Sequence, residues 1–234
     1  MNKSRRMVAL QARALALHGF AVAIVDLRGT GDSYGEHSAA TWDGWFADVV
    51  CAWSWLGTLA PVPRLLWGLR LGALLAADLV AQDAVDVFAL VLWQPILAGR
   101  LFFSQILRYA TARQIVAGSD ARMERKLLEN RLREGIVIEV AGYGLHPALV
   151  IPAERRSLSD LLDPTCMLVW HETTALTPVA LNAASVDIIA KLRNKGAHVE
   201  STAVDGPSFW ATQEITEAPN LIRATTNTIE RLLR

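Results

Sequence analysis

Residues 64–80 decide the fold of this chain, and they read Arg64-Leu-Leu-Trp-Gly-Leu-Arg-Leu-Gly-Ala-Leu-Leu-Ala-Ala-Asp-Leu-Val80. Their first part, residues 64–67, is typical of a short buried strand, because three large apolar side chains follow Arg64. Residues 72–80 favour an apolar helix. Between these segments, Gly68 and Gly72 flank three residues, and glycine lets the backbone turn tightly. The sequence therefore predicts a strand that bends sharply into a helix, with Arg70 at the bend.

The spacing of this turn matches the nucleophile elbow, Gly-x-Ser-x-Gly, of α/β-hydrolases. In that motif the central side chain stands above the sheet, at the positive end of the helix dipole. Here the central position holds Arg70, whose guanidinium stays protonated and cannot attack a carbonyl carbon. The chain thus has the frame of a hydrolase without its nucleophile. This pattern leaves open an enzyme with unusual chemistry, a relic of one, and a binding protein.

The composition indicates a globular protein and excludes two classes of partner. The 234 residues are 52% apolar and 20% charged, which suits one large α/β core and is too apolar for a disordered chain. Lys plus Arg number 23, as do Asp plus Glu, so no charge excess attracts nucleic acid or an anionic membrane. The longest apolar run, residues 85–98, is shorter than the roughly 20 residues that span a bilayer.

Cysteine usage and the N-terminal residues bear on the compartment. Cys51 and Cys166 are the only cysteines of the sequence, and neither stands in a metal-ligand spacing. So few cysteines in a chain of this size suggest a reducing compartment. The charged residues 2–6 are not followed by an apolar signal region. We therefore predict a cytoplasmic protein, and the sequence points to no metal and no cofactor.

Helical and strand-like segments alternate along most of the chain, which is typical of a parallel sheet with crossover helices. A helix over residues 3–17 precedes a β-rich run at 21–27, which predicts a strand covered on both faces. Residues 99–163 interrupt the alternation, and a short strand is expected at 149–151. We predict a single α/β domain over residues 1–234: a three-layer sandwich of helices around a mostly parallel sheet, with a small cap insertion at about 99–163.

Three local patterns together resemble the α/β-hydrolase superfamily. They are the run Asp26-Leu-Arg-Gly-Thr-Gly-Asp-Ser33, the elbow frame, and the cap-sized insert. More narrowly, residues 2–7, 67–72 and 206–210 resemble the second hydrolase associated with the exosortase A system, a family that accompanies bacterial exopolysaccharide and protein-sorting loci. This resemblance covers nearly the whole chain. It implies ester or thioester hydrolysis, or acyl transfer, in polysaccharide or lipid-linked metabolism.

The catalytic triad that the resemblance implies is missing at each of its usual positions. Arg70 occupies the place of the nucleophile. The acid is expected after the strand at 166–170, where His171-Glu172-Thr173-Thr174 offers only Glu172. The base is expected in the loop at 205–210, which carries aromatic residues and no histidine. Acyl-enzyme hydrolysis needs a nucleophile, a base and oxyanion donors. The alternative to a hydrolase with a degenerate triad is therefore a non-catalytic pseudo-hydrolase that binds an anionic ligand at Arg70 or acts as a scaffold.

Arg70 admits two interpretations. A cation at a helix N-terminus is electrostatically unfavourable without a negative partner. A salt bridge to Glu172 or Asp205 would supply that partner, and this interpretation is favoured. A bound carboxylate or phosphate would also supply it, in a site formed by Arg70 and Leu71 together with Trp93 and Trp210.

His171 and Glu172 are weak catalytic candidates. As neighbours on a strand that continues through them, they would point to opposite faces, which favours a structural role. Another mechanism would use a water activated by His171 or Glu172, with Arg70 as the electrophile.

Four tryptophans fall near the C-terminal ends of predicted strands, the edge at which open α/β sheets bind ligands. These are Trp67, Trp93, Trp170 and Trp210. They would either line a pocket for an apolar or sugar ligand, or fill the core between sheet and cap. The second interpretation is favoured, because large aromatic residues are most often buried. The expected partners are a small anionic or acyl/sugar ligand, and a homodimer is left open.

The resemblance also implies a missing strand. In this superfamily a strand before the first helix carries part of the oxyanion hole and lies between the strands that match residues 21–27 and 64–67. The present sequence begins at that first helix. We therefore expect an N-terminally shortened form of a longer protein. Without that strand, the two neighbours must pair directly or leave backbone groups unpaired.

Overall fold

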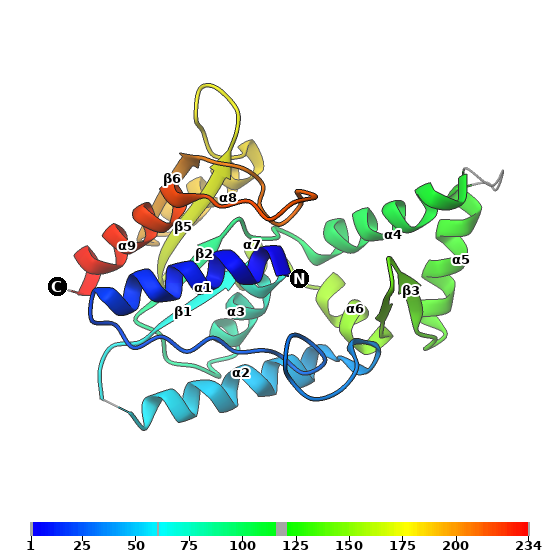
Figure 1. Ribbon diagram of the computed structural model, residues 1–234, viewed down its shortest axis with the longest axis horizontal. Helices are drawn as coiled ribbons and strands as arrows, with labels where there is room; N and C mark the ends of the chain where they lie inside the picture. Colours follow the sequence, from blue (N-terminus) through cyan, green and yellow to red (C-terminus); the bar gives the residue numbers. More distant parts are fainter. Residues whose placement is uncertain (1, 60, 116–120, 234) are drawn as a thin grey trace. The chain divides into compact units, whose positions relative to one another are not determined.

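The computed structural model describes residues 2–59, 61–115 and 121–233. For residues 2–3, 112–115 and 121 it describes the backbone only. Its contacts divide the chain into two compact units (Figure 1). The first unit comprises Met1–Ile24, Trp55–Pro95 and Ser159–Arg234, and the second comprises Val25–Ser54 and Ile96–Leu158. The single domain with an insertion at about 99–163 stays a prediction, and residues 116–120 of that insertion lie outside the described ranges.

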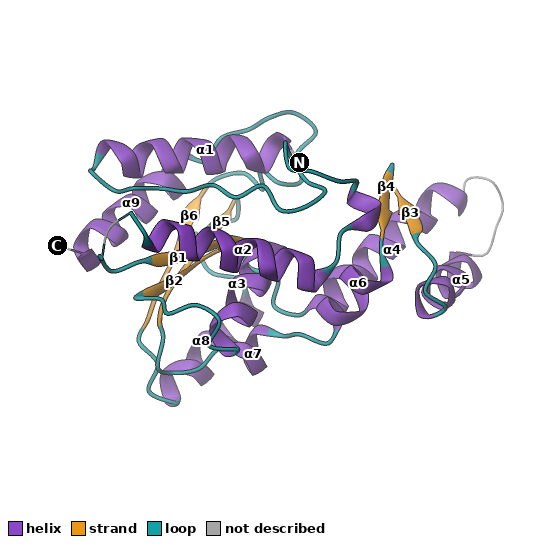
Figure 2. Ribbon diagram, turned by 90° about the horizontal axis from the view of Figure 1, so that it is seen from below, coloured by secondary structure: helices purple, strands orange, loops and turns teal. Residues whose placement is uncertain are grey.

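The first unit is built on a four-stranded parallel sheet with the order β1-β2-β5-β6 (Figure 2). The strands are β1 (Leu65–Leu69), β2 (Ala89–Trp93), β5 (Met167–Thr174) and β6 (Val199–Asp205). Every residue of β2 is buried, as expected for a central strand that is covered on both faces. The α/β class and the parallel sheet predicted from the sequence are confirmed.

Helices cover both faces of this sheet. On one face lie α1 (Asn2–Leu17) and α9 (Pro219–Leu233); on the other lie α3 (Leu71–Ala81) and α8 (Ala183–Asn194) (Figure 2). The alternation of β5 shows the two sides directly: His171 bonds to Thr225 of α9, whereas Glu172 bonds to Ser185 of α8. The three-layer arrangement is therefore confirmed.

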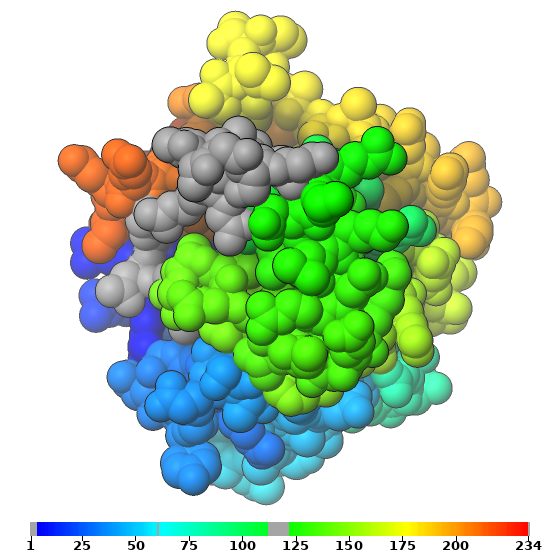
Figure 3. All heavy atoms as spheres, turned by 90° about the vertical axis from the view of Figure 1, so that its right-hand side faces the viewer, coloured from blue at the N-terminus to red at the C-terminus, as the bar shows by residue number. Residues whose placement is uncertain are grey.

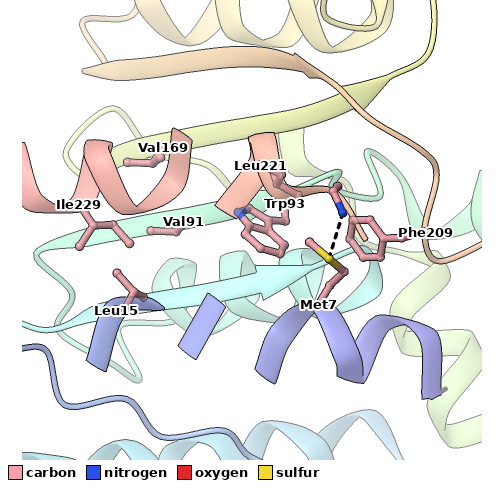
Figure 4. Packing of buried hydrophobic residues seen from close by; sticks show 9 residues of the cluster. Met7, Leu15, Val91, Trp93, Val169, Phe209, Leu221 and Ile229 are labelled. Atoms are coloured by element: carbon pink, nitrogen blue, oxygen red, sulfur yellow. Dashed lines mark hydrogen bonds between the residues drawn. The ribbon is translucent and has the colours of Figure 1, made fainter. Parts of the chain in front are cut away.

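The core on the α1/α9 face joins alternate residues of the sheet to both helices (Figure 4). Its buried members are Met7, Leu15, Val91, Trp93, Val169, Phe209, Ala218, Leu221 and Ile229. The backbone N–H of Ala218 donates to the sulfur of Met7 at 3.3 Å, which ties the start of α9 to α1. Burial of these apolar side chains, at roughly 25 cal/mol per Å², is what holds α1 and α9 on the sheet.

The strand predicted at residues 21–27 is wrong. The segment has no regular secondary structure and pairs with no described strand, and Ile24 is 49% exposed. A β-rich sequence forms a strand only when a neighbour accepts its backbone hydrogen bonds. From the sequence, this segment and the strand at 64–67 would either pair directly or leave backbone groups unpaired. In the structure they do not pair.

The outer edge of β1 is correspondingly open. The N–H of Phe88 donates to the carbonyl of Arg64, and the N–H of Arg70 donates to the carbonyl of Trp93, so the even-numbered residues of β1 face β2. The backbone groups of Leu65, Trp67 and Leu69 face the other way and meet no strand in the described part of the chain.

The second unit is mainly helical and contains a β3–β4 hairpin. Its elements are η1 (His37–Ala39), α2 (Trp42–Gly57) up to Ser54, β3 (Ile138–Val140), β4 (Tyr143–Leu145), α4 (Gly99–Ile115), α5 (Ala121–Arg133), α6 (Pro147–Glu154), and the first residue of α7 (Leu158–Leu161). Helix α5 and strand β3 lie against each other, in the green part of Figure 3. None of the described helices is long and apolar enough to cross a membrane.

The short strand predicted at residues 149–151 is also wrong, since these residues belong to α6. The helix starts at His146, whose Nδ1 accepts a hydrogen bond from the N–H of Ala148 at 3.0 Å, and Pro147 supplies a pre-set first helical residue. This local capping outweighs the β-branched character of the short apolar run.

Candidate functional site

The predicted turn from strand to helix is present, with Arg70 between β1 and α3. Arg70 has φ 55° and ψ −118°, a conformation that costs a non-glycine residue on the order of 1–3 kcal/mol. A side-chain carbon on Gly68 would lie 2.5 Å from the carbonyl oxygen of Gly72 and 2.5 Å from the Cα of Ala73, whereas one on Gly72 would meet no atom within 4 Å. The tight turn therefore requires glycine at position 68 but not at position 72.

The guanidinium of Arg70 is held in place without a carboxylate. Its Nη1 donates to the carbonyl of Gln94 at 3.2 Å, and its Cζ lies 5.0 Å from the centre of the Trp210 ring. Burial lowers the pKa of Arg70 below its usual value, and the charge of Glu172 works in the opposite direction. No acidic side chain of the described residues forms a salt bridge with Arg70. The favoured expectation of a bridge to Glu172 or Asp205 is therefore wrong.

Gln94 completes the support of Arg70, a role that no motif in the sequence predicted. Its φ of 41° is a second strained backbone angle, next to the elbow. Three bonds hold it: its N–H donates to the carbonyl of His171 at 2.9 Å, its Oε1 accepts from the N–H of Thr173 at 2.9 Å, and its carbonyl accepts from Arg70. The only signal in the sequence was a polar residue before Pro95 at the end of an apolar run. Such strained residues gather at binding and active sites.

Both carboxylate oxygens of Glu172 accept structural hydrogen bonds. The residue is 4% exposed. Its Oε1 accepts from the Trp170 indole at 2.9 Å and from the Ser185 hydroxyl at 2.5 Å, and its Oε2 accepts from the N–H of Asn182 at 2.8 Å. Asn182 in turn caps α8 through the N–H of Ala184. The carboxylate thus pins the start of α8 to the sheet.

His171 lies on the opposite face of β5 from Glu172, as the sequence predicted. It is 1% exposed, and its Nδ1 lies 2.9 Å from the hydroxyl of Thr225, which also accepts from the Trp93 indole at 2.8 Å. Burial lowers the pKa of His171 to about 4, while the charge of Glu200 acts in the opposite direction. Its Nε2 is buried without a partner among the described residues. The two side chains therefore cannot act on one water together.

The tryptophans are divided between core and surface. Trp93 and Trp170 are fully buried, while Trp67 and Trp210 are partly exposed. The rings form a chain of edge contacts, with centroids 4.6 Å apart for Trp67 and Trp93, 6.3 Å for Trp93 and Phe209, and 5.0 Å for Phe209 and Trp210. Trp93 has no surface to offer a ligand, whereas Trp210 lies beside Arg70. The ligand site itself stays a prediction.

The loop after β6 fills the place expected for a general base. The N–H of Gly206 donates to the carbonyl of Thr174 at 3.1 Å, and the Thr173 hydroxyl donates to the carbonyl of Pro207 at 3.2 Å. These bonds fix the loop to the end of β5, and the fully buried Phe209 anchors it in the core. Over the described ranges, no group of three His, Cys, Asp or Glu side chains is placed to hold a metal ion.

The parallel sheet and the elbow turn define the α/β-hydrolase fold. A family model described as serine aminopeptidase, S33, matches residues 1–203. The chain therefore belongs to this family of α/β-hydrolases, and the resemblance to the superfamily is confirmed. None of the curated proteins matches at a significant level.

Solved structures agree on the fold. Est1E from Butyrivibrio proteoclasticus, in complex with ferulic acid, matches with a TM-score of 0.66 and 13% identity over 97% of this chain and 83% of that one. A structure from a study of the metagenome-derived lipolytic enzymes LipS and LipT matches with a TM-score of 0.62 and 17% identity over 97% and 88%. Mouse alpha/beta hydrolase domain-containing protein 10 matches with a TM-score of 0.57 and 15% identity over 97% and 83%. At these identities the likeness shows the fold alone.

Proposed function

We propose that this chain is a non-catalytic member of the hydrolase family that binds an anionic ligand at Arg70. One observation carries the proposal: the elbow presents a fixed, partly desolvated guanidinium that lacks a carboxylate partner among the described residues. An unpaired cation in such surroundings is costly, and an anion relieves that cost. The N-terminus of α3, which begins at Leu71, adds a positive potential beside it.

The second candidate is the activity that the family suggests: hydrolysis of an ester or thioester, or acyl transfer. Family membership supports it, but fold alone does not assign chemistry. The nucleophile, acid and base of a Ser-His-Asp triad have no replacement among the described residues at the elbow, since Arg70 cannot attack and Glu172 is already held by three structural hydrogen bonds. A water activated by His171 or Glu172 would need that side chain and Arg70 within hydrogen-bond reach of it, but Nδ1 of His171 is bonded to Thr225 and Glu172 already accepts three hydrogen bonds. The degenerate triad thus favours binding over catalysis.

The setting of this function is also a proposal. The resemblance to the exosortase A system-associated hydrolases suggests a cytoplasmic role in exopolysaccharide or lipid-linked metabolism. The ligand would then be an anionic acyl or sugar derivative, and Trp210, which is partly exposed beside Arg70, provides an aromatic surface for its apolar part.

Two assays on the purified protein test the binding proposal. Acetate, phosphate or sulfate at constant ionic strength is expected to raise the melting temperature of the wild type, because a ligand of the folded state stabilises it. Arg70→Ala is expected to abolish the shift. A wild type that shows no shift would refute anion binding.

The same protein should neither turn over p-nitrophenyl esters nor react with a fluorophosphonate probe. Turnover above that of Arg70→Ala, or covalent labelling, would instead support the hydrolase.

We also propose that the natural protein carries a strand ahead of α1, as the superfamily resemblance implies. The open edge of β1 and the unpaired residues 21–24 support this proposal. The intact mass of the protein isolated from its source, together with the upstream reading frame, tests it. An in-frame extension that encodes a β-rich segment is the expected result, and an intact mass that begins at Met1 would contradict it.

A further inference from the structure

One nitrogen of the Arg70 guanidinium is already engaged in a hydrogen bond. This nitrogen, Nη1, is engaged by the carbonyl of Gln94 at 3.2 Å, while Nε and Nη2 have no hydrogen-bond partner in the described part of the chain. These two nitrogens carry parallel N–H groups along one side of the planar group. The free side therefore offers two donors that point in the same direction.

Trp210 lies beside the same group, with the Cζ of Arg70 over its ring. Its ring lies 5.0 Å from the Cζ of Arg70 and is itself held by an edge contact with Phe209, whose side chain is fully buried. The indole thus occupies the surroundings of the guanidinium on one side. The donors still available for a strong interaction are those of Nε and Nη2, which lie in the plane of the guanidinium.

Gln94 fixes the direction of that plane. Its backbone is bound to His171 and its side chain to Thr173, so the carbonyl that receives Nη1 belongs to a rigidly held residue. The unusual φ of 41° at Gln94 turns this carbonyl toward the elbow instead of continuing the strand. Gln94 is thus a positioning residue that acts through Arg70.

From these contacts we propose that the site selects an oxyanion with two coplanar oxygens, a carboxylate or a phosphoryl group, bound side-on to Nε and Nη2 of Arg70. The inference rests on the proposed anion binding and specifies its geometry. Bidentate contact of this kind is stronger and more selective than the attraction of a point charge, and lysine cannot reproduce it. A spherical anion such as chloride gains only the charge attraction.

The test compares four variants with three sodium salts at fixed ionic strength, using titration calorimetry. The salts are acetate, inorganic phosphate and chloride, and the variants are wild type, Arg70→Lys, Arg70→Ala and Gln94→Ala. Wild type is expected to bind acetate or phosphate at least about tenfold more tightly than chloride, and Arg70→Lys to lose about tenfold in affinity for the oxyanion while its affinity for chloride is unchanged.

Gln94→Ala should lower the ratio of oxyanion to chloride affinity several-fold, a readout that a merely destabilised fold would not change. Circular dichroism without ligand shows whether each variant is folded.

The outcomes separate this inference from the proposed function. If Arg70→Lys binds the oxyanion as tightly as wild type, or chloride competes equally, the side-on mode is wrong while anion binding stands. If wild type binds none of the salts, or Arg70→Ala binds as well as wild type, the proposed function itself fails. An unchanged selectivity ratio in folded Gln94→Ala would refute the positioning role of that residue.

Discussion

The two halves of the sheet's C-terminal edge differ in how their polar groups are used. Near the end of β5, both carboxylate oxygens of Glu172 accept hydrogen bonds, and the N–H and hydroxyl of Thr173 donate to neighbouring protein groups. At the ends of β1 and β2, Arg70 and Gln94 adopt strained backbone angles, and the guanidinium keeps donors to spare. The polar groups of the first half stabilise the fold, whereas the second half keeps N–H donors that are unbonded among the described residues, and for that reason the proposed ligand site lies on the elbow side.

The largest effect is expected for Glu172→Ala, on the side of the sheet where the polar groups are bonded. The change leaves the buried indole N–H of Trp170, the hydroxyl of Ser185 and the N–H of Asn182 without their acceptor, and we expect a loss of roughly 4 kcal/mol in the free energy of unfolding. Urea denaturation measures it. Glu172→Gln retains an acceptor oxygen and should lose less than half as much. Equal losses for both variants would mean that the charge, not the hydrogen bonds, carries the stabilisation.

The stability that His171 contributes is expected to depend on pH. Its pKa is about 4 in the folded protein, against an ordinary 6.5, so between these values the unfolded chain binds more protons than the folded one. Stability is therefore fully present above pH 6.5 and declines as the pH falls toward 4, by about 3 kcal/mol from this residue. Comparing melting curves of the wild type and His171→Gln from pH 7 to 4 isolates the contribution. Parallel pH profiles would contradict it.

On the elbow side, Gly68→Ala should destabilise the protein by about 2 kcal/mol, because the new carbon meets backbone atoms at 2.5 Å. The matched control is Gly72→Ala, which meets nothing within 4 Å inside the first turn of α3 and should be neutral or stabilising by up to about 1 kcal/mol. Glycine is thus required by packing at position 68, whereas the fold does not require it at position 72. Chemical denaturation of both variants checks the difference.

The smallest expected effect concerns the strain at Arg70. Arg70→Gly should be more stable than Arg70→Ala by about 1 kcal/mol, because glycine adopts φ 55° without strain and alanine does not. Both variants remove the guanidinium, so the difference reports the backbone alone. Equal melting temperatures would show that the elbow stores no strain.

Much of the fold follows from patterns within single segments. The turn at Gly68–Gly72, the helix at the N-terminus and the opposite orientations of His171 and Glu172 all depend on local periodicity and glycine placement, which one sequence reveals. The run at 21–27 failed because its β character says nothing about whether a partner strand is present. The run at 149–151 failed because a cap at His146 decided its structure.

The candidate site was only half predictable for a similar reason. Arg70 stood out because it occupies the position of the serine in the Gly-x-Ser-x-Gly motif. Gln94 did not, since its role arises from contacts with residues far along the chain, His171 and Thr173, that no spacing announces. The salt bridge expected for Arg70 failed because Glu172 was already committed to α8, and charge counting along a sequence cannot show how a carboxylate is engaged.

The open side of β1 has a consequence for handling the protein. Leu65, Trp67 and Leu69 present amide and carbonyl groups that meet no neighbouring strand within the described ranges, and such a ladder on an apolar strand is a template for any extended polypeptide. Two molecules that meet along this side would merge their sheets into one continuous ribbon. Concentrated solutions of the 234-residue chain should therefore associate and eventually precipitate, and a single lysine or proline on this strand should slow that process.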